Sequence, residues 1–418
     1  MKKRLTVILC AAMCALMCAC GITPSVKSPG SQTSSTDIGT AESAVPSDTR
    51  DAFADGAQST DEVPPEVSPE VSVDTVRLVM VGDILMHDPV IESGMTEDGC
   101  NYDHLFANIS QELAYADIAM LNQEVIIAGE QFGISGYPRF NSPLELADAI
   151  GKAGFDVVLH ATNHTLDKGR DAMLKCLSYW RQNHPDVKVA GMHDSEADAD
   201  NVCVIEKNGI KVAVLNYTYG VNPAGDQYIK SEPYLVDILI ESEVKRDIER
   251  AKEAADFIVV APHWGEEYTH TPTSSQKKWC ELFLKCGVDL VIGTHPHVLQ
   301  PIEWLEGEDG QRTLVYWSLG NYVNSTSEQG RGIGARMLGA MADVVIGKDE
   351  NGKVYIMSAG AIGLVTHVDF DSRGITTYKF EDYTQEMLAE NEAVNKDPSF
   401  TYQYCIETFS ELLGDFQD

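Results

Sequence analysis

Short apolar runs alternate with amphipathic stretches along the chain from Val76 onward. The apolar runs read RLVMV, DIAML, FDVVL, KVAVLNY, DFIVV, VDLVI and TLVYW. Between them lie stretches with helical periodicity, at residues 167–183, 241–255 and 274–286. Strands that alternate with helices are typical of α/β proteins, so this pattern predicts sheets flanked by helices.

The pattern changes beyond about residue 335. Segments at 341–347, 353–359 and 375–380 predict antiparallel strands, and the sequence DENG predicts a turn between the first two. A helix is expected near 400–413. We therefore expect residues 336–418 to supply strands and a helix that complete a domain at residues 75–335.

The amino terminus predicts export from a bacterial cell. Three basic residues at positions 2–4 precede an apolar run at 5–17, which is shorter than the roughly twenty residues that span a bilayer. The tetrapeptide MCAC ends at Cys20 and resembles a lipobox, in which a cysteine is lipidated after cleavage. We expect residues 1–20 to be a lipoprotein signal peptide. An ordinary cleaved signal peptide is the alternative.

Residues 21–74 are rich in Ser, Thr, Pro and acidic residues and show no hydrophobic periodicity. Such a composition is typical of a disordered linker. Together with a lipid on Cys20, it predicts an extracytoplasmic domain that is tethered to the bacterial cell membrane.

Composition narrows the range of partners. The 418 residues include 31 Lys and Arg against 64 Asp and Glu, a formal net charge of −33. So acidic a chain repels phosphate backbones, which excludes a nucleic-acid binder. An anionic substrate would therefore have to meet a local cation, either a basic side chain or a bound metal. No CxxC motif follows Cys20, and we expect the later cysteines to be buried thiols, although export permits disulfides.

Polar residues repeatedly follow the apolar runs. Because ligands bind at the carboxyl ends of strands in α/β sheets, these residues are expected to converge. Carboxylate, amide and imidazole ligands without a thiolate suit Mn, Fe or Zn, and a carboxylate can bridge two such ions. The candidates are Asp83, Asn122, Glu124, Asn163, His164, His263, His295 and His297.

Each candidate also has an ordinary structural explanation. Asp83 could be a turn residue after Gly82, and Glu124 could be a solvated carboxylate. Asn163 could cap the helix expected near residue 167. The two histidines of the THPH sequence could lie on the surface or in the core. Their alternate positions at the end of a predicted strand, followed by Gln300 and a polar turn, favour metal ligation.

Six sequence blocks carry a family resemblance. They read VGDILMHD, LNQE, ATNH, HWGEEY, GTHPHVLQPIE and SLGNYV, in that order over about residues 76–325. In these blocks the chain resembles the CapA-type capsule-synthesis (PGA_cap) proteins of the calcineurin-like metallophosphatase superfamily. The resemblance implies a metallophosphoesterase sandwich of mixed sheets flanked by helices, with two divalent metal ions.

The resemblance also implies a role for each candidate, including one bridging carboxylate and one histidine that donates a proton. The implied roles are Asp83 and His297 on the first metal, Glu124 as the bridge, Asn163, His263 and His295 on the second metal, and His164 as the proton donor.

Two positions depart from the superfamily pattern. The superfamily's first block is Asp-x-His, whereas His87 follows Asp83 by four residues, and Glu124 stands where a shorter Asp is usual. His87, Asn122 and Glu267 remain candidates either for metal or for hydrogen bonds to its ligands.

Two classes of function follow. In the first, the chain is a metal-dependent hydrolase or transferase for a phosphoester or an amide, serving poly-γ-glutamate capsule biosynthesis or anchoring, or acting as an independent surface metallophosphoesterase. In the second, it is a non-catalytic lipoprotein that binds poly-γ-glutamate or another anionic polymer within a membrane capsule-synthesis complex. The sequence leaves the choice, the substrate and the metal open.

Overall fold

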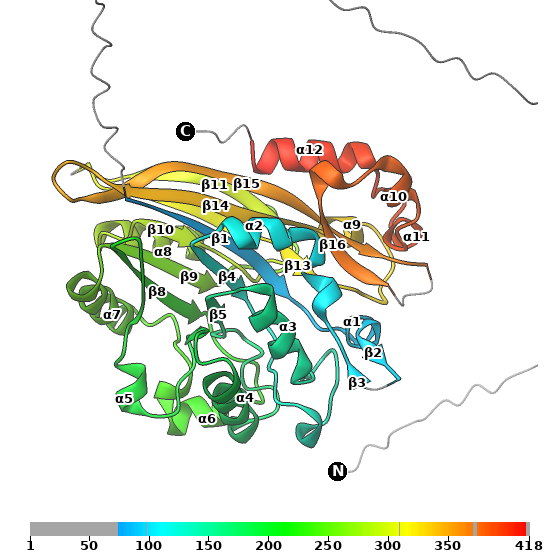
Figure 1. Ribbon diagram of the computed structural model, residues 1–418, viewed down its shortest axis with the longest axis horizontal. Helices are drawn as coiled ribbons and strands as arrows, with labels where there is room; N and C mark the ends of the chain where they lie inside the picture. Colours follow the sequence, from blue (N-terminus) through cyan, green and yellow to red (C-terminus); the bar gives the residue numbers. More distant parts are fainter. Residues whose placement is uncertain (1–73, 98, 309, 371–373, 415–418) are drawn as a thin grey trace, which may run out of the picture. The chain divides into compact units, whose positions relative to one another are not determined.

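The computed structural model describes residues 74–97, 99–308, 310–370 and 374–414. The expected signal peptide, Cys20 and the expected linker up to residue 73 lie outside the described residues. The described domain consists of two mixed β-sheets packed face to face, with helices on both outer faces (Figure 1). The α/β fold expected from the sequence is confirmed.

The first sheet has the strand order β16-β15-β14-β1-β4-β5-β6, and β13 also pairs with β1. The strands from β1 to β6 in this order are parallel, whereas β14, β15 and β16 are antiparallel. The bounds are β1 Thr75–Ile84, β4 Ile118–Asn122, β5 Val157–Leu159, β6 Lys188–Ala190, β13 Asn321–Val323, β14 Leu338–Lys348, β15 Val354–Val368 and β16 Ile375–Lys379.

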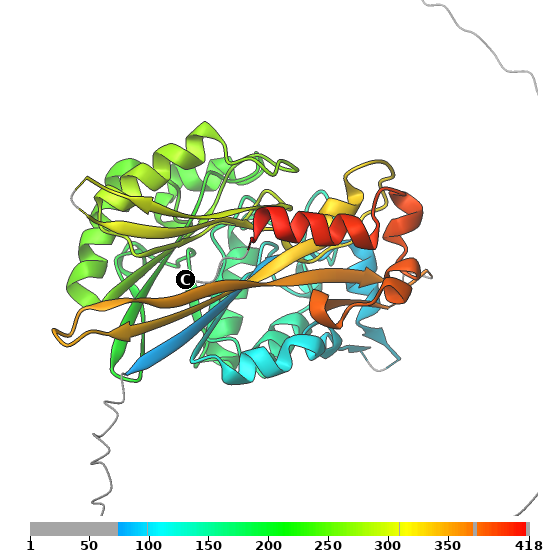
Figure 2. The same cartoon turned by 90° about the horizontal axis from the view of Figure 1, so that it is seen from above.

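The C-terminal strands expected beyond residue 335 are thus present. Figure 2 shows the long hairpin of β14 and β15 running beside β1, and β14 pairs with β1 from Thr75 to Val81. The C-terminal segment therefore belongs to the same sheet as the first strand of the domain.

The second sheet has the strand order β11-β12-β10-β9-β8-β7. Its four central strands are parallel and its two edge strands are antiparallel. The bounds are β7 Cys203–Lys207, β8 Ile210–Thr218, β9 Phe257–His263, β10 Leu290–Ile292, β11 Leu299–Glu306 and β12 Arg312–Leu319. A two-stranded ribbon of β2 (Met95–Thr96) and β3 (Gly99–Cys100) lies apart from both sheets.

Gln300 lies in β11, which continues to Glu306, so the expectation of a polar turn beside it was wrong. Its side chain is buried, accepts a hydrogen bond from Gln276 Nε2 and donates one to Thr269 O, both at 2.8 Å. These bonds satisfy a polar side chain inside a strand.

The central strands of both sheets are buried on two faces, which explains their almost continuous apolar runs. In β1, Leu78 and Met80 pack between the sheets, whereas Val79 and Val81 face the helices, as the two-residue period of a strand requires. Helices α3 (Glu145–Ala153) and α4 (Arg170–Asn183) cover the first sheet, and α7 (Glu241–Ala254) and α8 (Ser274–Lys285) cover the second.

The remaining helices are shorter, apart from α12. They are α1 Asp88–Ser93, α2 Ser110–Tyr115, α5 Glu196–Ala199, α6 Asp226–Ser231, α9 Ile333–Arg336, α10 Gln385–Ala389, α11 Ala393–Lys396 and α12 Tyr402–Leu412. The described residues also form 3₁₀ turns at Asp103–Leu105, Ala107–Ile109, Glu130–Phe132, Pro233–Leu235 and Phe380–Asp382.

Among the described residues, no helix combines the length and the apolar character needed to cross a membrane. The six described cysteines are free thiols, and three of them, Cys176, Cys280 and Cys405, are buried.

Candidate metal centre

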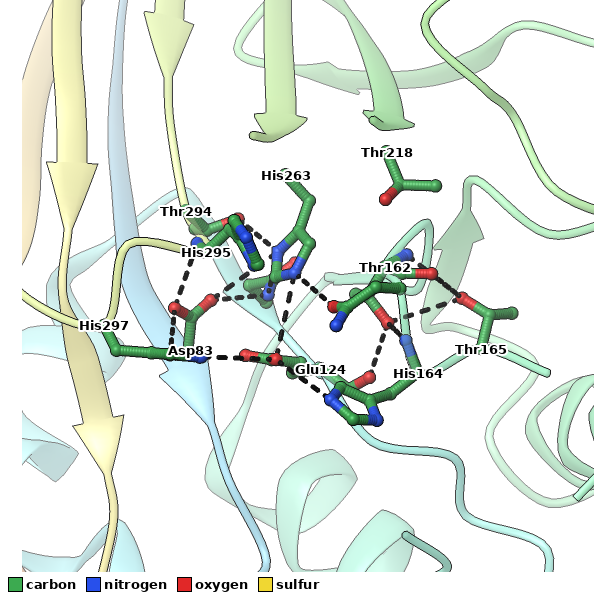
Figure 3. Close-up of polar contacts among 12 residues, drawn as sticks. Asp83, Glu124, Thr162, His164, Thr165, Thr218, His263, Thr294, His295 and His297 are labelled. Carbon is green, nitrogen blue, oxygen red and sulfur yellow. Dashed lines mark hydrogen bonds and ion pairs between the residues drawn. The ribbon is translucent and has the colours of Figure 1, made fainter. Parts of the chain in front are cut away.

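The predicted site residues meet where strands of both sheets end (Figure 3). The first sheet contributes residues at the ends of β1 and β4 and in the turn after β5, and the second sheet contributes the end of β9 and the turn after β10. The structure thus brings together Asp83, Asn122, Glu124, Asn163, His164, His263, His295 and His297.

Asp83 lies within β1 rather than in a turn, and it is fully buried. Its Oδ1 accepts a hydrogen bond from Asn122 Nδ2 at 2.8 Å, and its Oδ2 accepts one from the His295 backbone N at 3.0 Å. Its Oδ2 also lies 3.3 Å from His297 Nδ1. Asp83 therefore joins the two sheets at the site.

A close backbone approach places Asp83 there. A Cβ on Gly82 would lie 2.0 Å from the carbonyl oxygen of Gly320, so only glycine fits. The neighbouring Asp83 N donates to that same carbonyl at 3.0 Å.

Glu124 lies at the centre of the cluster and is only 1% exposed, so it is not a solvated carboxylate. Its Oε1 lies 3.7 Å from His297 Nε2, 3.8 Å from His263 Nε2 and 3.9 Å from His164 Nε2. Neither of its carboxylate oxygens has a hydrogen-bond partner in the described chain. Burial raises the pKa of Glu124 well above its usual range. The charge of His297 acts to lower this pKa, and the negative charge of Asp83 acts to raise it further.

Asn163 contacts the cluster through its side chain. Its Oδ1 lies 2.9 Å from Nε2 of the fully buried His263. The residue that caps α4 is Gly169, so Asn163 does not cap that helix.

His295 and His297 occupy a strained turn after β10. Their φ angles are 97° and 58°, in a region that residues other than glycine seldom adopt. This conformation turns the His295 backbone N and the His297 ring toward Asp83. Strain of this kind persists where the surrounding structure fixes it, typically at functional sites.

The pKa values of the imidazoles are shifted in different directions because their neighbours differ. Burial lowers the pKa of His263 and His295 well below the usual value. Burial also acts to lower the pKa of His297, but the carboxylates of Glu124 and Asp83 outweigh it and raise this pKa to about 9.

The donor atoms of this cluster fit a divalent cation. Each of three residue groups has its donor atoms within 4.8 Å of one another: Glu124, His263 and His295; Asp83, Glu124 and His297; Glu267, His295 and His297. The buried atoms without a hydrogen-bond partner include both Glu124 oxygens, His295 Nδ1 and Asn122 Oδ1. A buried carboxylate without partners is costly, and a metal ion would satisfy it.

His164 is 7% exposed and faces Glu124 through Nε2. Its other nitrogen, Nδ1, lies 2.6 Å from Asp167 Oδ2. Asn222 Nδ2 donates to Asp167 Oδ1 at 3.1 Å. The Thr162 hydroxyl donates to the Glu124 carbonyl at 2.6 Å and accepts from His164 N at 3.1 Å, which ties this turn to the one after β4.

The three remaining candidates lie around the cluster. Asn122 is buried and donates to Asp83. His87 is partly buried and lines a cleft beside the cluster with His164 and His297. Burial, and next the proximity of His297, lower its pKa to about 4. Glu267 is exposed, although its carboxylate reaches the donor atoms of His295 and His297.

Sequence reasoning missed two polar partners of the site. Asp167 lies three residues after His164, a spacing that was visible in the sequence and that points to a paired histidine. Asn321 lies in the SLGNYV block but was not among the candidate residues. Its Oδ1 lies 3.1 Å from His297 Nδ1, and its Nδ2 donates to the His297 carbonyl at 3.2 Å.

The sequence profile of the family described as "Bacterial capsule synthesis protein PGA_cap" matches residues 77–326, which span all the clustered side chains. The chain belongs to this family. It is 28% identical over 258 residues to "Capsule biosynthesis protein CapA" of Bacillus anthracis, across 59% of this chain and 59% of that protein. It is 33% identical over 258 residues to "PGA biosynthesis protein CapA" of Bacillus subtilis (strain 168), across 60% of this chain and 64% of that protein. The matched region spans less than two thirds of either relative.

Solved structures resemble the domain more distantly. NAD nucleotidase (NadN) of Haemophilus influenzae has 11% identity and a TM-score of 0.42, covering 82% of this chain and 65% of that one. The sulfate thiohydrolase SoxB of Thermus thermophilus has 12% identity and a TM-score of 0.40, covering 84% and 61%. Likeness at this level does not bear on the function of this chain.

Proposed function

We propose that this chain is a metal-dependent hydrolase or transferase that acts on an anionic cell-surface polymer during capsule biosynthesis. The observation that carries the proposal is the Glu124 carboxylate, which is buried, accepts no hydrogen bond from the described residues and is common to two of the three donor groups. Two divalent ions, of Mn, Fe or Zn, with Glu124 between them would satisfy both of its oxygens.

The remaining candidate ligands fall into two sets, one for each ion, on either side of Glu124. Asp83 and His297 would hold one ion, and Asn163, His263 and His295 would hold the other. When bound, such ions activate water at neutral pH and stabilise charge on the oxygens of the reacting group.

The chain itself supplies the proton transfer. With Asp167 accepting from Nδ1 at 2.6 Å, an imidazolium at His164 carries its second proton on Nε2, on the side of Glu124. From there it can protonate a leaving oxygen or nitrogen and become neutral, while Asp167 keeps the ring oriented. Asn222 in turn fixes the Asp167 carboxylate.

The capsule assignment rests on family membership. The family description and the names of both relatives refer to capsule or PGA biosynthesis, which supports poly-γ-glutamate as the polymer. Its carboxylates are negatively charged, so a cationic site is the part of this acidic protein that could meet them. Lipidation at Cys20, attachment to the outer face of the membrane and assembly with a capsule-synthesis complex belong to the same proposal.

A substrate panel tests the function. The purified, metal-loaded protein is incubated with a phosphodiester and with a γ-glutamyl oligomer, and product release is measured. Turnover that a chelator abolishes is expected for at least one of them. Binding of the oligomer without turnover of either would contradict hydrolysis and favour a non-catalytic accessory protein.

A further inference from the structure

A cleft of about 400 Å³ opens beside the cluster of candidate metal ligands. His164 and His297 line it from the cluster, and Tyr268, Glu328 and Arg336 also line it. Arg336 is the one Lys or Arg among its described lining residues. In a protein of net charge −33, a cation at this place stands out electrostatically.

The guanidinium of Arg336 is held in place from several sides. Arg336 is the last residue of α9, and its side chain is 15% exposed. Its guanidinium lies 3.9 Å from the ring centroid of Tyr268, and its Nη1 donates to Glu328 Oε2 at 2.7 Å. Stacking and pairing of this kind reduce the freedom that the side chain would lose on binding a ligand.

Arg336 is also tied to the cluster of candidate metal ligands through its backbone. Asn321 Nδ2 donates to the Arg336 carbonyl at 3.0 Å, while Asn321 Oδ1 contacts His297 Nδ1. The Asn321 side-chain amide therefore helps to position both Arg336 and the candidate metal ligand His297.

Not all N–H donors of the Arg336 guanidinium have an acceptor among the described residues. Its Nε is buried and has no partner among the described residues. Glu328, the carboxylate that it pairs with, has a side chain that is 63% exposed, so this pair contributes little. A guanidinium presents five N–H groups in a planar fork that matches a carboxylate or a phosphate.

We propose that Arg336 is a specificity-determining residue that binds an oxyanion of the substrate, a carboxylate or a phosphate, beside the reacting group. The inference rests on the proposed function only in taking this cleft as the substrate site. It explains how an acidic protein accepts an anionic polymer at a metal centre.

Calorimetric titration of the metal-loaded full chain with inorganic phosphate and with γ-glutamylglutamate tests the proposal. Arg336→Gln is expected to weaken binding of at least one probe by about 10- to 100-fold, the effect of losing hydrogen bonds to a charged group. The probe that loses affinity identifies the oxyanion. Arg336→Lys keeps the charge without the fork and is expected to lose about fivefold or more.

Arg331→Gln is the matched control, because Arg331 lines a neighbouring cavity but not this cleft. It is expected to change affinity by less than about twofold, as for a screened surface charge. Wild-type affinity of both Arg336 variants for both probes would overturn the proposal, as would failure of the wild-type protein to bind either probe. Metal content and melting temperature, measured for each variant, exclude a folding defect.

The outcome is separable from the proposed function. If Arg336→Gln loses affinity for a probe while the wild-type protein turns over no substrate, the oxyanion site is supported and hydrolysis is contradicted. If the wild-type protein turns over substrate and Arg336→Gln changes neither turnover nor probe binding, hydrolysis is supported and the oxyanion site is contradicted.

Discussion

At the scale of single residues, two buried histidines show how neighbours decide the role of an imidazole. His160 Nε2 accepts a hydrogen bond from Trp180 Nε1 at 3.0 Å, and burial lowers its pKa to about 3. His164, four residues later, pairs with Asp167 and faces Glu124. The first is a neutral core residue, and the second is placed to transfer a proton.

Replacing His164 separates catalysis from metal binding. His164→Ala is expected to retain the metal content of the wild-type protein and to lose about 10²- to 10⁴-fold in turnover, the usual contribution of general acid catalysis. The loss should be small for nitrophenyl substrates, whose leaving groups need little protonation. Full turnover of unactivated substrates by this variant would contradict the role of His164.

His160 makes a pH-dependent contribution to stability. The unfolded imidazole takes up a proton near pH 6.5, whereas the folded one does so only near pH 3. Between about pH 3 and pH 6.5 the unfolded state therefore binds more protons than the folded state. The stability that the neutral His160 contributes above pH 6.5 is lost as the pH falls through this range. We expect the drop in unfolding free energy between pH 7 and pH 5 to be about 2 kcal/mol smaller in His160→Gln than in wild type. Urea unfolding at both pH values measures it, and equal drops would refute this account of His160.

At the scale of elements, the site depends on how closely β1 and the segment around β13 approach each other. The Gly82 position leaves no space for a side chain against Gly320, and the adjacent Asp83 joins both sheets. Local backbone fit thus controls the position of a candidate metal ligand.

Adding a methyl group at Gly82 is expected to destabilise the domain. In Gly82→Ala, the new Cβ would have to push the Gly320 carbonyl away, at a cost of about 1–3 kcal/mol in unfolding free energy. Gly220→Ala is the control, since a Cβ there meets nothing within 4 Å. Denaturant unfolding compares the two, and equal stability of Gly82→Ala and wild type would contradict the close approach.

At the scale of the whole molecule, the sequence predicted the strands and their convergence because the central strands are buried on both faces and polar residues lie at, or shortly after, the ends of several of them. It did not predict the contacts of Asn321 and Arg336, which depend on distant segments meeting at His297 and Tyr268. A polar turn was expected beside Gln300 because the polarity of this residue hides its burial in β11. Residue type and spacing predict a strand, but they do not give the partner of a polar side chain.

Attachment to the membrane is a prediction about the whole chain. Cys20→Ser is expected to move the protein from the membrane fraction to the soluble fraction, because the acyl chains contribute about 0.8 kcal/mol per buried CH₂ group. Fractionation in high salt tests this, and unchanged membrane retention of the variant would refute lipidation at Cys20.

The central claim is that Glu124 bridges two divalent ions, and metal analysis of the purified protein tests it most directly. Inductively coupled plasma mass spectrometry is applied to wild type, to Glu124→Gln and to Glu303→Gln, which carries the same substitution in β11. The account predicts about two ions per chain in wild type and Glu303→Gln, and loss of both in Glu124→Gln. Full metal content in Glu124→Gln, or none in wild type purified with excess Mn, Fe and Zn, would contradict it.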